Sequence, residues 1–205
     1  MSYNVTFFHG WSYNADFFKD ITSEFEGFCQ FFDRGYYGHS SVPVLGDGKN
    51  IAVTHSMGLF YLCEHYALDN FDKIIVLSGF SDFCAGRDHS IVVNLKDSLK
   101  KDILKTLRRF ALLCNDKNRI MPKANIQLDL LQADLDLLME RNIYESLLPH
   151  KQKIYTIHAE QDKVIPYEYS SIPYGKNIIV ENVGHVYNLE HNKNILGVIK
   201  SWIME

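Results

Sequence analysis

A chain of 205 residues, of which 46% are hydrophobic and 22% charged, is long enough for one globular domain with a substantial core. Its formal net charge of −4 argues against binding nucleic acid through general charge. No apolar run reaches the ~18 residues that a membrane-spanning helix needs, so neither nucleic acid nor a membrane is expected as a partner.

The first four residues, Met1-Ser2-Tyr3-Asn4, lack the basic and apolar stretches of a signal peptide, and a cytoplasmic protein is expected. The nine histidines show no metal-ligand spacing, since His185 and His191 lie six apart and no HExxH occurs, so no metal and no other cofactor is expected. The four cysteines lie far apart, which is typical of reduced thiols: Cys29, Cys63, Cys84 and Cys114.

Short β-favouring apolar runs alternate with segments of helical apolar spacing along most of the chain. The alternation predicts an α/β fold with a mostly parallel sheet of about six strands. The predicted strands are 4–8, 27–32, 51–54, 73–78, 153–158 and 177–180, and the predicted helices are 14–25, 59–68 and 188–204.

The segment 81–150 breaks this alternation, because leucines and charged residues recur at helical spacing without an evident strand. We expect it to form an inserted cap of three or four helices. The predicted organisation is therefore a core of residues 1–80 and 151–205 that carries the cap, and the chain is expected to act as a monomer.

The third predicted strand ends in Thr-His-Ser-Met-Gly, and a helix-like segment follows at once. A strand, a sharp turn holding a Ser and a helix make up a nucleophile elbow, G-x-S-x-G. Gly58 fits this pattern, whereas Thr54 stands in place of the first Gly. Ser56 would lie at the helix N-terminus, where backbone N–H groups stabilise a developing oxyanion. The alternative is that Ser56 is only a helix N-cap.

A nucleophilic Ser needs a base, and the base needs a carboxylate to orient it. Asp162 and His185 follow the fifth and sixth predicted strands, at the edge of the sheet where ligands bind. The order Ser56, Asp162, His185 is that of α/β-hydrolases. Glu160 is the rival acid, Asp162 is alternatively a turn residue, and His185 is alternatively a loop histidine.

An oxyanion hole needs two backbone donors. We expect them to be the N–H of Met57 and the N–H of Trp11, where Gly10 permits a close approach of the first loop. The indole of Trp11 is expected to line the acyl pocket, the alternative being an ordinary core aromatic. His9 and His55 are expected to be structural neighbours of this loop and of the elbow.

The stretches FFHGWSYNADFF, THSMG, HAEQDKVIP and NVGHVYNLEH resemble the α/β-hydrolase superfamily. The HGW-x-x-N start and the compact cap are similar to the pimeloyl-[acyl-carrier protein] methyl ester esterases of biotin synthesis. The resemblance implies an α/β-hydrolase fold and a cofactor-free serine carboxylesterase with Ser56, Asp162 and His185 as catalytic residues. It also implies acyl-carrier protein as the partner, which carries the methyl ester of a pimeloyl chain.

Two cap stretches, LSGFSDFCAGRD and KTLRRFALL, resemble segments of the same esterases. On that match Lys105 and Arg109 would face the acidic carrier protein, and Arg108 shares their helix face at spacing i, i+3, i+4. The alternative is a solvated face whose basic residues pair with neighbouring carboxylates. The residues that would line the acyl tunnel are Phe110, Ala111, Leu112, Leu113 and Cys114.

Three functions stay open on this basis. The first is an esterase for a carrier-bound acyl methyl ester, and the second is a generalist hydrolase of small esters or thioesters without a protein partner. The third is a hydrolase-fold binding module without catalysis, which the complete set Ser56, Asp162 and His185 disfavours.

Overall fold

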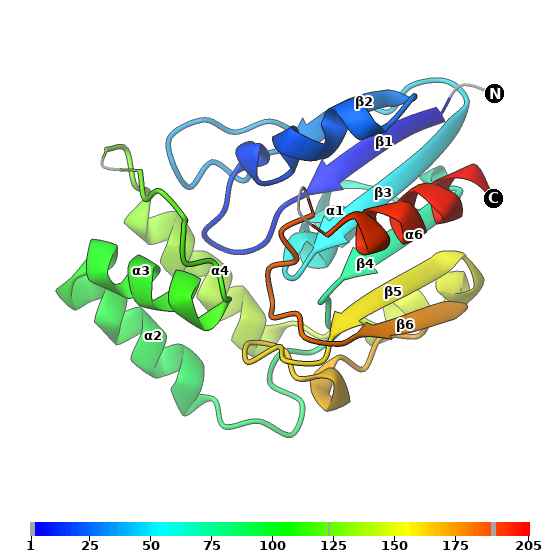
Figure 1. Cartoon of the computed structure of the whole chain (residues 1–205). Coiled ribbons are helices and arrows are strands. Elements are labelled where there is room, and N and C mark those ends of the chain that lie inside the picture. The colour runs from blue at the N-terminus through cyan, green and yellow to red at the C-terminus, as the bar shows by residue number, and fades with distance from the viewer. Residues whose placement is uncertain (1–2, 123, 190–191) are drawn as a thin grey trace.

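The computed structural model describes residues 3–122, 124–189 and 192–205. Met1, Ser2 and His191, which the sequence analysis mentions, lie outside the described residues. Six strands form one sheet in the order β2-β1-β3-β4-β5-β6 (Figure 1). Each neighbouring pair is parallel, which confirms the predicted fold class.

The strands lie close to their predicted positions, and each differs by about two residues or fewer at either end. Their bounds are β1 (Tyr3–Phe8), β2 (Phe28–Phe32), β3 (Lys49–His55), β4 (Lys73–Leu77), β5 (Ile154–Ala159) and β6 (Lys176–Val180).

The helices differ more from the prediction. The first is a 3-10 helix, the elbow helix ends early because Tyr66 is extended, and the last begins only after Asn192, whose side chain caps it. The helices of the core are η1 (Ala15–Glu24), α1 (Gly58–His65), η2 (Leu68–Asn70), η4 (Tyr167–Tyr169) and α6 (Lys193–Met204).

Strand residues alternate between the two faces of the sheet, as the period of two requires. Phe7, Val53 and Ile75 belong to the apolar cluster that includes η1 and α6. Phe8 and Val76 belong to the other cluster, together with α1 and the inserted helices. Both faces are therefore covered, which explains the near-continuous apolar runs of a parallel sheet.

The inserted segment leaves the core after β4 and returns before β5. Its helices within residues 90–140 lie to one side of the sheet, and the last part of the segment leads back to the start of β5 (Figure 1). At its base Ile143 N–H donates to Ser81 O at 2.9 Å, and Asp82 pairs with Asn142, so the two connections run side by side. No described helix is long and apolar enough to cross a membrane. The inserted helices are α2 (Ser90–Lys101), α3 (Ile103–Leu113), α4 (Leu128–Glu140), α5 (Tyr144–Leu147) and the 3-10 turn η3 (Leu148–Lys153).

The start of α1 packs so closely on the end of β1 that it requires a glycine. A Cβ added at Gly58 would lie 2.3 Å from Phe8 O and 2.9 Å from His9 O. Both atoms are backbone and cannot move aside cheaply. We therefore expect Gly58→Ala to lower the free energy of unfolding by about 3 kcal/mol or more, as overpacking does.

Gly197 in α6 is the matched control, because a Cβ there meets nothing within 4 Å. Gly197→Ala should raise the free energy of unfolding by about 0.5–1 kcal/mol through helix propensity. Urea unfolding of both variants measures the two effects. Equal stability of the two variants would contradict this account of the close approach at Gly58.

Candidate active site

Ser56 lies in the sharp turn between β3 and α1, with a backbone φ of 53°. This left-handed conformation is strained for a residue other than glycine and costs about 1–3 kcal/mol. The turn is held in place because Ser56 N–H donates to Leu77 O of β4 at 2.9 Å. Such strain at a Ser that lines a cavity is typical of a functional turn.

The loop after β1 approaches this turn closely. A Cβ on Gly10 would lie 3.1 Å from Ser56 Cβ and 3.0 Å from His55 Nδ1, so glycine lets the two segments meet. Thr54, which replaces the first glycine of the elbow pattern, is fully buried and lies between Phe8 and Val76 of the neighbouring strands. The sheet therefore accommodates a β-branched side chain at this position.

Asp162 and His185 are brought together although 23 positions separate them. His185 Nδ1 donates to Asp162 Oδ2 at 2.8 Å, and Asp162 Oδ1 accepts from Val164 N–H and Ile165 N–H, each at 2.8 Å. Both side chains are buried. Glu160 is exposed and instead accepts a long bond from Asn182 N–H at 3.4 Å, so the carboxylate on His185 is that of Asp162.

The hydrogen bonds keep the buried carboxylate ionised. Burial by itself would raise the pKa of Asp162, but the attraction and hydrogen bond of His185 and the backbone donors lower it below the usual value. An ionised carboxylate at Nδ1 leaves the proton of His185 on that nitrogen. The opposite nitrogen, Nε2, is then free to accept a proton.

His55 joins the turn of Ser56 to the loop of His185. Its Nε2 donates to His185 O at 2.9 Å, its ring lies 4.8 Å from that of His185, and its other face stacks on Phe17. Burial, together with the neighbouring His185, lowers the pKa of His55 to about 3. His55 is therefore a neutral structural group, and its contacts place the His185 loop beside Ser56.

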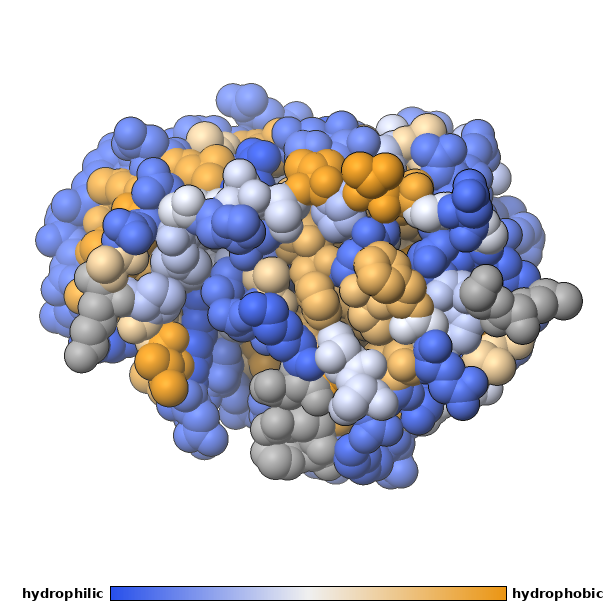
Figure 2. All heavy atoms as spheres, turned by 90° about the horizontal axis from the view of Figure 1, so that it is seen from above, coloured by the Kyte–Doolittle hydropathy of each residue, from blue (hydrophilic) through white to orange (hydrophobic). Residues whose placement is uncertain are grey.

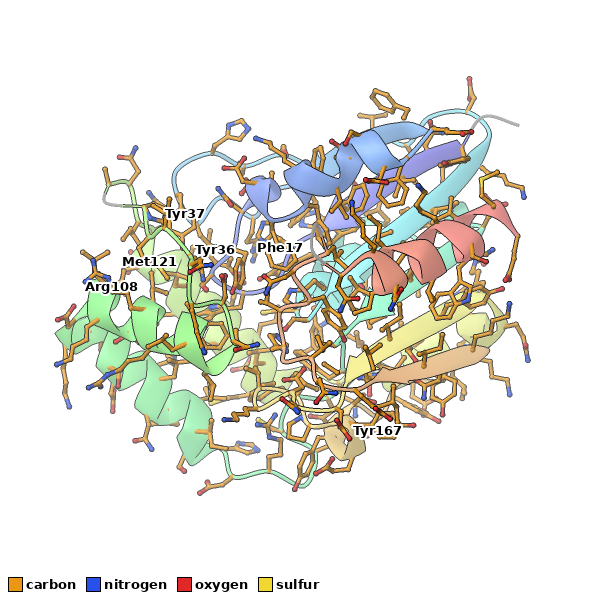
Figure 3. All side chains as sticks on the ribbon, viewed as in Figure 1. Phe17, Tyr36, Tyr37, Arg108, Met121 and Tyr167 are labelled. Atoms are coloured by element: carbon orange, nitrogen blue, oxygen red, sulfur yellow. The ribbon has the colours of Figure 1, made fainter. Side chains whose placement is uncertain are left out.

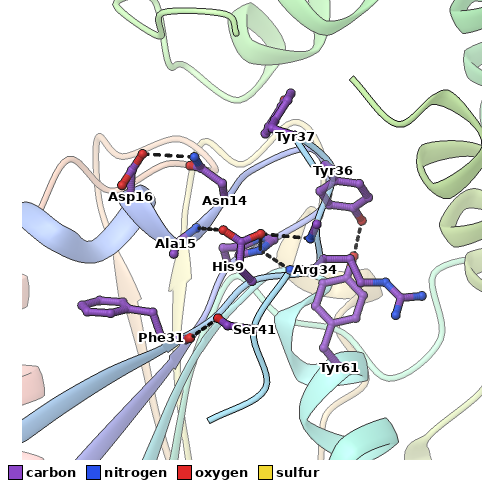
Figure 4. A network of polar contacts seen from close by, with 12 residues as sticks. His9, Asn14, Ala15, Asp16, Phe31, Arg34, Tyr36, Tyr37, Ser41 and Tyr61 are labelled. Carbon is purple, nitrogen blue, oxygen red and sulfur yellow. Dashed lines mark hydrogen bonds and ion pairs between the residues drawn. The ribbon is translucent and has the colours of Figure 1, made fainter. Parts of the chain in front are cut away.

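Two backbone N–H groups near Ser56 have no hydrogen-bond acceptor among the described residues. They are the N–H of Met57, which directly precedes α1, and the N–H of Trp11. His9 fixes the second group, because its Nε2 accepts from Arg34 N–H at 3.1 Å and its Nδ1 donates to Gly10 O at 2.8 Å (Figure 4). The Gly10 carbonyl and the Trp11 N–H belong to one trans peptide and point in opposite directions.

Ser56 opens into a small cavity of about 40 Å³ under the cap. The indole of Trp11 lines it and donates through Nε1 to Leu131 O of α4 at 2.9 Å, while Phe110 meets the indole edge to face at 4.9 Å. A cavity of this size holds only a few waters. Apart from Ser56 the lining is apolar: Trp11, Met57, Phe80, Phe83, Ile91, Val92, Leu95, Phe110, Leu135, Leu138 and Val164.

The structure does not bring the other predicted tunnel residues to this cavity. Leu112 and Leu113 are 60% and 46% exposed, because they lie on the solvent side of α3. Ala111 and Cys114 are buried, and Cys114 O accepts from Val186 N–H beyond His185. Among the residues 110–114, Phe110 is therefore the one that lines the cavity, and the expectation for the following four is corrected.

Lys105, Arg108 and Arg109 all lie on the exposed side of α3, and Arg108 points away from the core at the outer edge of the cap (Figure 3). In the part of the chain that the structure describes, none of the three forms an ion pair with a carboxylate. Lys100 does so with Asp97 at 3.8 Å. The alternative in which the basic residues pair with neighbouring carboxylates is therefore met by Lys100 of α2, but not by these three residues of α3.

A larger cavity of about 570 Å³ lies behind the His185 loop, between η1 and the segment that follows α3. Its walls include Tyr13, Phe17, Asp116, Arg119 and Val186 but not Ser56. Seen from above, apolar side chains lie in the middle of a largely hydrophilic, hollowed face (Figure 2). The smaller cavity is the candidate site, because Ser56, the candidate nucleophile, lines it. No three His, Cys, Asp or Glu side chains of the described residues gather as a metal site would require.

A buried polar cluster beside this site was not predicted from the sequence. It is formed by Arg34, Tyr36, Tyr61 and Asp134. The one available signal was Asp134, a charged residue on an otherwise apolar helix stripe. Its partners lie between 73 and 100 positions earlier in the chain, so sequence spacing could not identify them.

Comparisons with solved structures agree with this architecture. An esterase from Exiguobacterium antarcticum superposes with a TM-score of 0.76 at 18% identity, covering 100% of this chain and 92% of its own. A hydrolase from Oleispira antarctica gives 0.77 at 11% identity, with coverage of 100% and 92%. A bromoperoxidase from Bacillus anthracis gives 0.72 at 16%, with coverage of 100% and 93%.

No protein-family model matches the sequence, and no curated protein matches it by sequence. The structural agreement establishes the fold. Because the sequence identities are this low, the activity has to be argued from the site itself. The chain has the α/β-hydrolase fold.

His158, near the end of β5, makes the stability of the core sensitive to pH. The residue is 1% exposed, packs on Tyr167 and has no partner for either ring nitrogen among the described residues. Burial lowers the pKa of His158 to about 4. Below the unfolded value of about 6.5 the unfolded chain binds a proton that the folded chain does not, so acidification destabilises the fold.

We expect the free energy of unfolding to fall by about 2 kcal/mol more between pH 7 and pH 5 in the parent protein than in His158→Leu, which cannot bind this proton. The neutral His55 acts in the same direction, but it is present in both proteins and cancels. Urea unfolding at the two pH values measures the difference. Equal losses in both proteins would show that His158 keeps its ordinary pKa.

Proposed function

We propose that the chain is a serine hydrolase of carboxylic esters, with Ser56 as nucleophile, His185 as base and Asp162 as orienting acid. The observation that carries the proposal is the buried Asp162–His185 hydrogen bond of 2.8 Å. It lies at the sheet edge where the strained Ser56 turn is also held, and His55 connects the two. This combination of residues and roles is that of a Ser-His-Asp triad.

In the proposed reaction, His185 Nε2 takes the proton of Ser56 Oγ while the oxygen attacks the ester carbonyl. The unpartnered N–H groups of Met57 and Trp11 then receive the negative oxygen of the tetrahedral intermediate. His185 returns the proton to the departing alcohol and activates water in the second half of the reaction. Asp162, kept ionised by its donors, stabilises the imidazolium that forms between these steps.

The cavity favours esters in which the part that enters the cavity next to Ser56 is uncharged and apolar. Its lining residues other than Ser56 carry no charge, and an unpaired ion would lose its hydration there. The cavity holds about 40 Å³, so a long chain enters only if side chains or cap helices move. A methyl ester end or a short acyl group requires the least movement.

The finer proposal is hydrolysis of the methyl ester of pimeloyl-[acyl-carrier protein]. Its support is the position of α3, which presents Phe110 to the cavity and exposes Lys105, Arg108 and Arg109. Acyl-carrier proteins are acidic, and exposed basic side chains on the helix that carries Phe110 would steer such a partner. A small apolar ester group at Ser56 would leave the rest of the acyl chain to extend toward the carrier.

A generalist hydrolase of small free esters or thioesters is the second candidate. The small volume of the closed cavity favours it, since such substrates need no partner to open the cap. The two candidates share Ser56, His185 and Asp162 and differ in whether the basic side of α3 contributes to substrate binding.

Removal of the proposed catalytic groups tests the reaction class. Ser56→Ala and His185→Ala should each lower kcat for p-nitrophenyl acetate by about 10⁴-fold or more. Asp162→Asn should lower it by about 10⁴-fold, because the amide favours the wrong tautomer of His185. The matched control is Glu160→Gln, which removes an exposed carboxylate two positions away. It should leave kcat within about twofold of the parent value.

The assignment of the acid is wrong if Glu160→Gln loses activity and Asp162→Asn keeps it. Circular dichroism on each variant separates loss of chemistry from loss of fold. A parent protein that hydrolyses neither p-nitrophenyl acetate nor longer p-nitrophenyl esters would refute the proposed function as a whole.

Charge reversal on α3 tests the carrier-bound substrate. Lys105→Glu combined with Arg109→Glu should raise KM for a methyl ester on acyl-carrier protein about tenfold at low salt and leave p-nitrophenyl acetate unchanged. The difference should shrink at higher salt, because exposed charges are screened within ~10 Å at 0.1 M. The matched control reverses Lys49 and Lys151, which are exposed at the opposite edge of the sheet.

Two outcomes would contradict a carrier-binding role for α3. In the first, both double reversals change KM for the carrier-bound ester equally. In the second, the α3 reversal slows hydrolysis of free and carrier-bound esters equally. The generalist hydrolase would then be the better proposal.

A further inference from the structure

Helix α4 carries a charged residue in the middle of its buried face. Leu131, Asp134, Leu135 and Leu138 are the buried residues of this helix, and their spacing of i, i+3, i+4 and i+7 places them on one stripe. Asp134 is 1% exposed. A carboxylate in such a position is tolerated only if its oxygens are fully bonded.

The core supplies four hydrogen bonds to this carboxylate. Arg34 binds it with two nitrogens, Nε to Oδ2 at 3.0 Å and Nη2 to Oδ1 at 2.7 Å. Tyr36 and Tyr61 donate their hydroxyls to Oδ2 at 2.7 Å and 3.2 Å. Arg34 and Tyr36 follow β2, and Tyr61 belongs to α1 (Figure 4). The fork of Arg34 fixes both the distance and the orientation of α4 relative to the core.

The same helix touches the candidate active site at two points. One turn before Asp134, Leu131 O accepts the indole N–H of Trp11 at 2.9 Å, and Trp11 supplies one of the two unpartnered N–H groups. After Asp134, Leu135 and Leu138 line the cavity of Ser56. A shift or rotation of α4 would therefore move both Trp11, in the loop after β1, and the wall of the cavity.

We propose that Arg34 and Asp134 are positioning residues for the ester hydrolysis proposed above: their buried ion pair sets the register of cap helix α4 and, through Leu131 O, holds Trp11 at the oxyanion site. The inference rests on the proposed function for its kinetic consequence. The anchoring of Trp11 is independent of that function.

Stability alone does not account for the pair. Replacing a buried ion pair by apolar side chains of similar volume is often neutral or stabilising, and the rest of the α4 stripe is already leucine. A leucine at position 134 would leave α4 free to slide along its apolar contacts. The two-point hydrogen bonding of the Arg34 guanidinium to Asp134 instead allows only one position of α4 along the core. Selection of one register by a buried polar group is known from coiled coils.

The decisive variant is Arg34→Lys, which keeps the charge beside Asp134 but loses the two-point geometry. The matched control is Asp136→Asn on the same helix. It removes an ion pair with Lys96 that joins α4 to α2 inside the cap and touches no core residue. Arg34→Met combined with Asp134→Leu serves as a second test, because it removes both charges and leaves no buried ion unpaired. Glu64, which lies 3.7 Å from Arg34, is exposed and stays hydrated.

The first readout is hydrogen exchange of the two indole N–H groups, which give separate NMR signals because the chain has Trp11 and Trp202 as its 2 tryptophans. The variant Trp202→Phe assigns them. In Arg34→Lys and in the double variant, the Trp11 indole should exchange about tenfold faster or more. The Trp202 indole should stay within about twofold, and Asp136→Asn should change neither rate beyond that range.

The second readout is hydrolysis of p-nitrophenyl acetate. We expect kcat to fall about 10- to 100-fold in Arg34→Lys and in the double variant, as for a misplaced oxyanion donor, with little change in KM. Asp136→Asn should keep the parent kcat. Unchanged Trp11 exchange, or unchanged kcat in a folded variant whose Trp11 exchange has risen, would overturn the positioning role. Lack of hydrolysis by the parent protein would refute the proposed function, while the exchange rates would still decide the anchoring of Trp11.

Discussion

The candidate site depends on the parallel alignment of the six strands. Parallel strands bring their carboxyl ends to one edge, so the loops after β1, β3, β5 and β6 meet there although they are far apart in sequence. The Asp162–His185 hydrogen bond and the contact of Gly10 with Ser56 are both consequences of this alignment. An antiparallel order would send half of these loops to the opposite edge.

Close packing determines the conformation and the polarity of the loops at the carboxyl ends of the strands. Ser56 has a strained backbone angle, and the glycines at positions 10 and 58 let the loop after β1 and the start of α1 pack closely around it. Among the described residues, the N–H groups of Met57 and Trp11 have no protein acceptor. Burial keeps His55 neutral and requires Asp162 to be fully bonded. Polar groups with unused hydrogen-bonding capacity therefore lie in the loops next to the Ser56 turn, as the proposed acyl transfer requires.

The cap contributes an apolar enclosure and one polar anchor. Eleven of the residues that line the Ser56 cavity are uncharged apolar or aromatic side chains, and α4 is tied to the core through Asp134. A mobile cap would open the small cavity easily but would also displace Trp11. The buried pair between Arg34 and Asp134 ties α4 to the core at the part of the helix that contacts Trp11. Helices α2 and α3 have no comparable buried ion pair with the core among the described residues.

The sequence alone was sufficient to predict the strands, the elbow at Ser56 and the identity of Asp162 and His185 as candidates. Each of these is encoded locally, by an apolar run or a short motif next to a strand end. It also left Glu160 open as the acid. Only the tertiary structure showed which of the two carboxylates bonds to His185, because the direction of each side chain depends on how the loop after β5 folds onto β6.

The structure also decided which side of α3 faces inward. The match of the segment 110–114 to a tunnel placed all five residues there, but a helix turns by about 100° per residue. Leu112 and Leu113 consequently face solvent, while Phe110 reaches the cavity. The pair of Arg34 and Asp134 was beyond sequence reasoning for a related physical reason. Its two residues belong to elements that meet only when the cap folds back onto the core, and no local pattern records that contact.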